Sequence, residues 1–204
     1  MLNEPNRKGF LLVISSPSGG GKTTIYKALL EMGEPFAFSV SATTRPPRSD
    51  EVEGIHYYFI SDERFDEMIV ENKFAEWAVV HSHRYGTPRE SVENALRENK
   101  VMIFDIDVQG AAQLKAKYPK DTVLIFVAPP SATATESRLK ARKTDSQKDI
   151  ELRMKDARQE IEQYSNFDYL VYNDKLEDAI ADVLAIVNAE KLAVKRFCGK
   201  VWPD

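Results

Sequence analysis

Hydrophobic runs alternate with amphipathic stretches along this chain. Residues 10–14, 101–104 and 123–127 are apolar without a polar interruption, and residues 169–172 form a shorter run of the same kind. Uninterrupted runs of this length are typical of strands that are covered on both faces, as in the centre of a parallel sheet. Helical periodicity fills the intervals, and the expected helices span residues 23–32, 89–99, 109–117, 132–142, 149–164 and 176–194. The pattern therefore predicts a layered α/β fold with a mostly parallel sheet.

Two segments depart from this alternation. The first contains short β-rich pieces, a proline-rich turn at 45–48 and one short helix that Ser61 or Asp62 can cap. We interpret residues 36–87 as a lobe inserted into the sheet domain. A second insertion, a helical lid at residues 133–156, is expected where four cationic side chains fall within six residues. The predicted organisation is a single domain, 1–204, with its core in residues 8–35, 88–132 and 157–204.

Composition narrows the class of protein. The chain has 204 residues, a net charge of −4 and a single cysteine, Cys198. One cysteine can form neither an intramolecular disulfide nor a thiolate cage for a metal, which fits a reducing compartment. No stretch reaches the roughly 18 consecutive apolar residues of a membrane helix, and residues 1–9 lack the apolar stretch of a signal peptide. We therefore expect a cytoplasmic protein that binds neither membrane nor nucleic acid, although a local basic cluster can still hold a small anion.

The strongest chemical motif is SPSGGGKT at residues 16–23, which follows the first apolar run and precedes a helix. Its glycines allow backbone N–H groups to turn inward around a phosphate, and the helix directs its positive end at the same anion. Lys22 supplies a mobile charge for the β- and γ-phosphates, and the Thr23 hydroxyl can ligate Mg²⁺. Ser16 stands where the usual motif has its first glycine. The expected ATP-binding residues in this segment are Ser16, Pro17, Ser18, Gly19, Gly20, Gly21, Lys22, Thr23 and Thr24.

Further motifs follow the phosphate loop in a fixed order. They are FSVSATTRPPR (38–48), Gly54, YYF (57–59), FAEW (74–77), YGT (85–87), DIDVQG (105–110), APPS (128–131), the set Arg138, Arg142 and Arg153, and ND (173–174). This set resembles the bacterial-type guanylate kinases and spans nearly the whole chain. The resemblance implies a three-layer P-loop NTPase core with an inserted GMP-binding lobe and a helical lid. It also implies transfer of the γ-phosphate of ATP to GMP, and to dGMP, with Mg²⁺, in purine nucleotide metabolism.

The residues make chemical sense of GMP as a substrate. Guanine presents donors at N1–H and at its amine beside an acceptor at O6, whereas adenine presents the reverse. The Glu76 carboxylate can accept both donors, while the hydroxyls of Ser41 and Thr87 donate to O6. Arg45 and Arg48 flank a rigid Pro-Pro turn and can make forked bonds to a phosphate dianion. The resemblance implies that GMP is bound by Ser41, Arg45, Arg48, Tyr57, Glu76, Tyr85, Thr87 and Asp107.

The remaining candidates concern the transferring phosphate. Arg138 and Arg142 are four residues apart on an expected helix, and Arg153 returns from the next. Guanidinium groups on a closing lid can neutralise that phosphate and exclude water. Asp105 ends an apolar run, where a carboxylate can orient Mg²⁺-bound water, and the resemblance places Asn173 near adenine. The resemblance implies that the catalytic residues are Lys22, Arg45, Arg138, Arg142 and Arg153.

Other interpretations stay open at this point. Each candidate also has an explanation that needs no ligand. The arginines of the 45–48 turn can be solvated surface residues, the tyrosines can be core residues, Glu76 can be an exposed carboxylate on a strand, and the helix of Arg138 and Arg142 can present a solvated face. The same scaffold also supports a kinase of another substrate, such as a ribosyl phosphate, and guanylate-kinase-like modules that have lost catalysis and bind peptides. The alternation of His81 and His83 is weak support for a metal site, since no third ligand lies nearby. The sequence leaves a homo-oligomer open.

Overall fold

The structure, a computed structural model, describes residues 7–17, 19–80, 82–141 and 147–200. Within these residues the larger sheet has five parallel strands in the order β2, β7, β1, β8, β9. They are β1 (Phe10–Ser15), β2 (Phe36–Phe38), β7 (Val101–Phe104), β8 (Thr122–Ala128) and β9 (Tyr169–Tyr172). Side chains of β1 enter two separate cores in turn, Leu12 on one face and Leu11 and Val13 on the other. Burial on both faces explains an apolar run without alternation.

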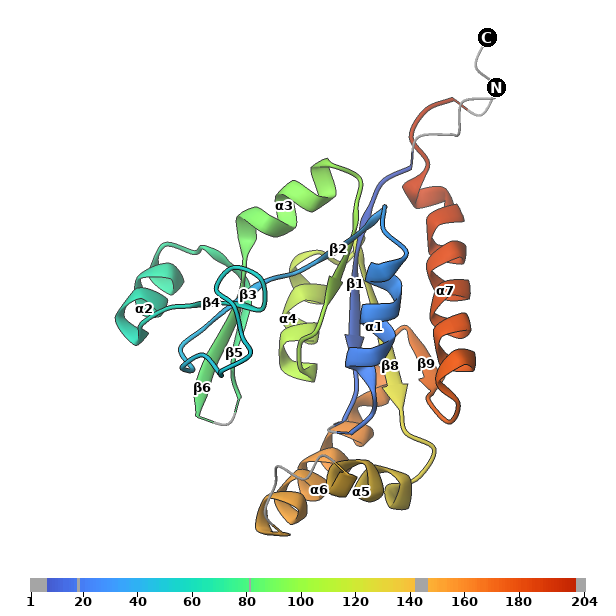
Figure 1. Cartoon of the computed structure of the whole chain (residues 1–204). Coiled ribbons are helices and arrows are strands. Elements are labelled where there is room, and N and C mark those ends of the chain that lie inside the picture. Colours follow the sequence, from blue (N-terminus) through green and yellow to red (C-terminus); the bar gives the residue numbers. More distant parts are fainter. Residues whose placement is uncertain (1–6, 18, 81, 142–146, 201–204) are drawn as a thin grey trace.

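Helices cover both faces of the larger sheet (Figure 1). One face carries α1 (Lys22–Glu31) and α7 (Leu176–Leu192), and the other carries α3 (Arg89–Arg97) and α4 (Val108–Lys117). Ile25 and Val183 fill the first core, while Val92 and Leu114 fill the second. The predicted three-layer α/β fold is confirmed, and the expected helices match the observed ones to within about three residues at each end.

A smaller four-stranded sheet with its own helix forms the inserted lobe. Within the described residues its order is β4 (Tyr57–Phe59), β3 (Ser41–Thr43), β6 (His83–Pro88), β5 (Phe74–Val80). Helix α2 (Asp62–Val70) begins after Ser61, whose hydroxyl accepts from the Arg64 N–H at 3.2 Å. Phe65 of α2 packs on Phe74 of β5, with ring centroids 4.5 Å apart. The expected start of this lobe at residue 36 shifts, because β2 pairs with β7 in the larger sheet.

Helices α5 (Ala132–Ala141) and α6 (Gln147–Ile161) lie against one another beyond the carboxyl ends of β1 and β8 (Figure 1). A 3₁₀ turn, Glu162–Asn166, leads from α6 to β9. Helix α6 crosses residue 156, where the predicted lid ends, so the lid and the core share one continuous helix. Among the described residues, no helix has the length and apolar character to cross a membrane.

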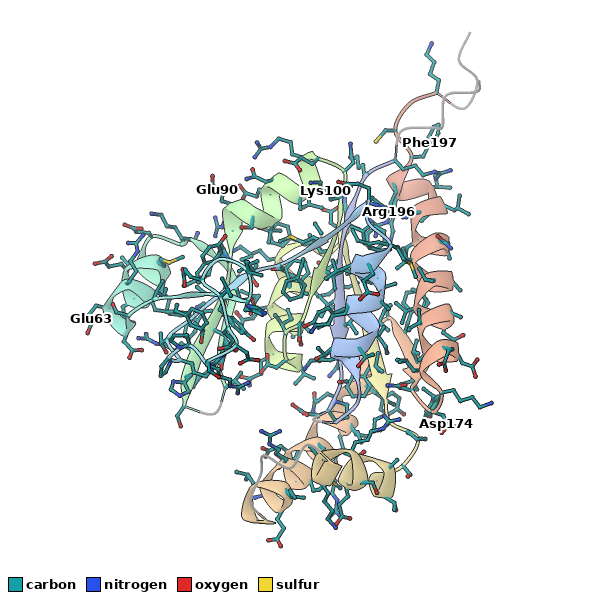
Figure 2. All side chains as sticks on the ribbon, in the orientation of Figure 1. Glu63, Glu90, Lys100, Asp174, Arg196 and Phe197 are labelled. Atoms are coloured by element: carbon teal, nitrogen blue, oxygen red, sulfur yellow. The ribbon has the colours of Figure 1, made fainter. Side chains whose placement is uncertain are left out.

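The opposite end of the larger sheet is closed by the C-terminal segment. A second 3₁₀ turn, Val194–Arg196, follows α7, and Arg196 is 1% exposed. Its guanidinium lies over the Phe10 ring, 4.2 Å from the centroid, and donates to Glu190 Oε2 at 3.0 Å. Figure 2 shows Arg196 and Phe197 at the end of the molecule away from α5 and α6. Within the described residues, these contacts hold the C-terminal segment against the end of the larger sheet that lies away from α5 and α6.

Candidate active site

The loop between β1 and α1 has the backbone of a phosphate cradle. Gly19 and Gly21 have φ of 82° and 89°, in the left-handed region that favours glycine. Gly21 precedes α1 without a side-chain cap, so the first N–H groups of the helix are left for an anion. The amide of Asn173 donates to the Gly20 carbonyl at 2.8 Å and braces the loop from β9. Ser18, which we expected to take part, lies outside the described residues.

Lys22 begins α1 and meets a carboxylate at the end of β7. Its Nζ lies 3.2 Å from Asp105 Oδ1, and both side chains are partly exposed. Tyr26, one turn along α1, interacts with Asp105 and Thr23. Burial and the negative charge of Asp105 raise the pKa of Tyr26 to about 12. Sequence reasoning missed Tyr26, although its spacing of three residues from Thr23 puts both on one face of a helix.

A cavity of about 410 Å³ joins the phosphate loop to the smaller sheet. Loop residues 16, 17 and 19–24 line one side of it. The other side brings together residues far apart in the sequence: Ser41, Arg48, Tyr57, Glu76, Tyr85, Asp105 and Asp107. Most of the predicted ATP and GMP residues therefore share one cavity, although Arg45, Thr87 and Asn173 do not line it, nor do the predicted catalytic residues Arg138 and Arg153.

Glu76 is the buried carboxylate of this cavity, with 4% of the residue exposed. Its Oε1 accepts from the Thr87 hydroxyl at 2.6 Å and from the Thr87 N–H at 3.1 Å. Burial raises the pKa of Glu76 to about 7, the Thr87 bonds oppose that rise, and the nearby charge of Asp107 adds to it. Thr87 itself is fully buried. In this structure the hydroxyl donates to Glu76, and its donation to the base stays a prediction.

Arg45 and Arg48 are organised by Glu51, which the sequence did not single out. Arg45 Nη2 donates to Glu51 Oε1 at 2.7 Å, and the Arg48 N–H donates to Glu51 Oε2 at 2.8 Å. The hydrogen bond from Arg45 is the main cause that lowers the pKa of Glu51. The Arg45 guanidinium also lies over the Tyr57 ring, 5.5 Å from its centroid. Tyr57 meets Tyr85 edge-on, with centroids 5.8 Å apart, so the two predicted tyrosines do lie together.

A second, smaller cavity of about 310 Å³ lies between the loop, helix α5 and the segment that follows β9. Arg138 lines it together with Gly19, Thr24 and Asn173. Arg138 Nη2 donates to the Asn173 carbonyl at 2.8 Å, while Nη1 is buried and has no hydrogen-bond partner among the described residues. A buried donor without a partner suits an anionic ligand. Arg153 lies half-buried on α6 and lines neither cavity, and Arg142 lies outside the described residues.

Asp107 lies just before α4, where its Oδ1 accepts from the Gly110 N–H at 2.8 Å, so this carboxylate caps the helix as well as lining the cavity. His83 is half-buried on β6, and His81 lies outside the described residues. No group of three or more His, Cys, Asp or Glu side chains in the described chain is arranged to hold a metal. Thr23 and Asp105 both line the cavity at the phosphate loop.

Comparison with known proteins now decides the family. A family model described as guanylate kinase matches residues 8–190. The chain belongs to the guanylate kinase family. The guanylate kinase of Sphingopyxis alaskensis is 47% identical over 196 residues, covering 96% of this chain and 89% of that protein. The guanylate kinase of Agrobacterium fabrum is 49% identical over 193 residues, covering 95% and 88%.

A solved guanylate kinase also shares the fold. The crystal structure of guanylate kinase from Anaplasma phagocytophilum superimposes with a TM-score of 0.79 at 31% sequence identity, and covers 96% of this chain and 93% of that one. The likeness therefore extends over both sheets and the helices beyond them. The phosphate loop, the buried Glu76 and Arg138 of α5 all lie within the residues that the guanylate kinase family model matches.

Proposed function

We propose that this chain transfers the γ-phosphate of ATP to GMP, and to dGMP, giving ADP and the guanosine diphosphate. One observation carries the proposal: a single cavity joins the phosphate loop to a buried carboxylate that suits the guanine edge. Membership of the guanylate kinase family supports the same reaction. The proposal extends to a cytoplasmic role in purine nucleotide metabolism, which rests on the substrates and on a sequence with one cysteine.

Glu76 reads the base in this proposal. Oε1 already accepts two hydrogen bonds from Thr87, so Oε2, with both of its lone pairs, is the oxygen that faces the donors of guanine. N1–H and the amine favour the ionised carboxylate, whereas adenine would set a lone pair against it. With adenine bound, the buried carboxylate would lack hydrogen-bond partners. Because an unpaired buried polar group is costly, such a site rejects the wrong base by a large factor. Ser41, which lines the cavity, donates to O6.

The GMP phosphate lies between the loop of Arg45 and Arg48 and the two tyrosines, Tyr57 and Tyr85. Arg48 already lines the cavity. Arg45 uses one guanidinium donor on Glu51 and another on the Pro46 carbonyl. A guanidinium has five N–H donors. Arg45 can therefore donate to Glu51 and the phosphate at the same time, or leave Glu51 to bind the phosphate. Forked bonds from both arginines would then fix the phosphate that attacks.

ATP binds through the phosphate loop, with Lys22 leaving Asp105 for the β- and γ-phosphates. Arg138 then has a ligand for its unpartnered Nη1, and we assign Arg142 and Arg153 to the same phosphates when the lid closes. Asn173 braces the loop from behind, beside the cavity that we assign to adenosine.

The residues present fit Mg²⁺. Hydroxyl and carboxylate oxygens, Thr23 and Asp105, form the hard donor set that this ion takes when substrate phosphates and water complete its shell. Thr23 would hold it directly, and Asp105 through water. When bound, the ion neutralises charge on the β- and γ-phosphates.

Phosphoryl transfer itself needs no side-chain nucleophile. An oxygen of the GMP phosphate attacks the γ-phosphorus, the bond to the β-phosphate oxygen breaks, and ADP leaves with that electron pair. Lys22 and the lid arginines stabilise the charge that spreads over the transferring group. Closure of α5 and α6 excludes water, which would otherwise hydrolyse ATP.

A coupled assay that measures ADP release tests the proposed function. With ATP and Mg²⁺ held constant, GMP, dGMP, AMP and UMP are compared as acceptors by kcat/KM. We expect GMP to be used best, dGMP next, and AMP and UMP at background rates. Preferential use of AMP or UMP would overturn the guanine assignment, and ADP release without any acceptor would contradict transfer to a nucleotide.

A further inference from the structure

Helix α4 meets the base-reading strand at a residue without a side chain. Gly110 lies in the first turn of α4 and is buried. A Cβ placed on Gly110 would lie 2.6 Å from Glu76 Oε2 and 3.4 Å from Asp107 Oδ1. The first distance is far inside van der Waals contact, so only glycine allows the helix and this carboxylate to be so close.

The two oxygens of Glu76 are held by different means. Oε1 accepts from the N–H and the hydroxyl of Thr87, whereas no described residue donates to Oε2. Oε2 instead lies in the space that a side chain at position 110 would fill. The Gly110 N–H also donates to Asp107, so one residue lies beside both carboxylates of the cavity.

The same face of α4 holds the backbone of β5 on both sides of Glu76. The Gln113 amide donates to the Trp77 carbonyl at 2.8 Å and accepts from the Trp77 N–H at 3.2 Å. Lys117 donates to the Phe74 carbonyl at 2.9 Å. Because the strand is fixed at two points, a clash at Gly110 is relieved most easily by the end of the Glu76 side chain.

We propose that Gly110 is a positioning residue that determines guanine specificity: by lacking a side chain it lets α4 hold Glu76 Oε2 where the base is read. This inference rests on the proposed role of Glu76. A methyl group at position 110 turns the carboxylate away from guanine and leaves the fold in place. The helix itself gains from the change, since alanine has the higher helix propensity.

The test compares Gly110→Ala with the wild-type protein and with Ala112→Ser. Ala112 is exposed, two residues along the same helix, so this control also adds one atom to α4 but at a position that does not line the cavity of Glu76. We expect Gly110→Ala to raise KM for GMP by about tenfold to a hundredfold, the cost of misplacing a binding group by about 1 Å. KM for ATP and the thermal unfolding midpoint should stay at their wild-type values, as should all three quantities in Ala112→Ser.

A second pair of variants separates the contact from a general defect. In a Glu76→Asp background the carboxylate is one methylene shorter and clears the added methyl group. The fold-change in KM for GMP caused by Gly110→Ala should therefore be several times smaller there than in the wild type. If Gly110→Ala alone does not fold, the Gly110→Ala/Glu76→Asp protein should fold, because the clash is gone.

Four outcomes would overturn the inference. They are an unchanged KM for GMP in Gly110→Ala, equal fold-changes in both backgrounds, a parallel rise in KM for ATP, and failure of both Gly110→Ala proteins to fold. Wild-type activity with GMP alongside an unaffected Gly110→Ala protein removes the inference and leaves the proposed function standing. A wild-type protein that does not use GMP removes both.

Discussion

The side of the cavity that we assign to the base and the side that we assign to the phosphates are built in opposite ways. On the base side, Glu76 is buried, accepts two hydrogen bonds from Thr87 and fills the space that a side chain at Gly110 would need, so the carboxylate is held in place. On the phosphate side, the cations rest on partners within the protein. Lys22 pairs with Asp105 and Arg45 with Glu51.

The difference follows from what each side must recognise. A base is selected by a few directional bonds, and a preformed buried site makes a wrong partner costly. A phosphate that arrives, reacts and leaves needs cations that can change partners. Partly exposed ion pairs such as Lys22–Asp105 contribute little stability and can be broken at small cost. One cavity therefore combines a fixed carboxylate, Glu76, with cations such as Lys22 that can change partners.

Removing the phosphate-side cation should have the largest effect. For Lys22→Ala we expect kcat to fall by at least about a hundredfold, the scale of losing one group that stabilises transition-state charge. The unfolding midpoint should hardly change, because the ion pair it breaks is partly exposed. The coupled assay and a thermal melt measure the two quantities, and Lys27→Ala, an exposed position on the same helix, is the control. Near-normal turnover would remove Lys22 from the mechanism.

Glu76→Gln tests the rigid side. The amide keeps the shape of the side chain but turns an N–H group, or a weaker neutral acceptor, toward the guanine donors. We expect kcat/KM for GMP to fall by about tenfold to a hundredfold, with KM for ATP unchanged, since unpaired buried donors cost about 1–3 kcal/mol. The control is Glu90→Gln, an exposed carboxylate on α3 (Figure 2). An unchanged response to GMP would mean that the base side is not read through Glu76.

The pH dependence of kcat/KM tests the base side separately from the phosphate side, because Glu76 changes its charge near neutral pH. Burial raises the pKa of Glu76 to about 7, and guanine needs the ionised form. For the free enzyme, kcat/KM for GMP should therefore fall by up to about tenfold per pH unit below pH 7. The phosphate of GMP itself titrates near pH 6. The matched measurement is therefore the pH profile of Glu76→Gln, in which the phosphate still titrates and the Glu76 carboxyl is absent. Identical profiles for the two proteins would contradict the pKa assignment.

Stability should respond to the same group in a defined direction. Because the folded-state pKa of Glu76 lies above its value in the unfolded chain, the folded protein holds the proton more tightly. The stabilisation from protonation is complete below about pH 4.5 and is lost as the pH rises toward 7. The unfolding free energy of Glu76→Gln, relative to the wild type, should thus increase over that interval in urea titrations. A constant difference across it would contradict the raised pKa.

The fold was predictable to within a few residues because its strongest signals are local. The unbroken apolar run of β1 reports a strand buried on both faces, and the glycines before Lys22 report the loop that follows it. Strand β2 was misplaced, since three residues carry too little pattern to reveal that they pair with β7, more than 60 positions away.

The candidate site was predictable as a set of residues and less so as a set of contacts. Glu76, Arg48 and Tyr57 do face one cavity, as the motifs indicated. The partners of these residues had no local signal: the bond between Thr87 and Glu76 was not expected, and Glu51 was not singled out although it accepts from Arg45. Such pairings form between segments, so only the folded chain reveals which polar group each side chain satisfies.

The smallest expected effect tests whether the phosphate side truly exchanges its partners. Glu51→Gln keeps an acceptor for the Arg48 N–H, and therefore the shape of the loop, but removes the charge that competes for Arg45. If Glu51 acts as the resting partner of Arg45, KM for GMP should fall by at least about two- to fivefold at low salt, since even an exposed ion pair accounts for that factor and this pair is mostly buried. Asp50→Asn, an exposed position in the same loop, should change nothing. A rise in KM instead would show that Glu51 holds Arg45 in place for the phosphate, and that this side is as rigid as the other.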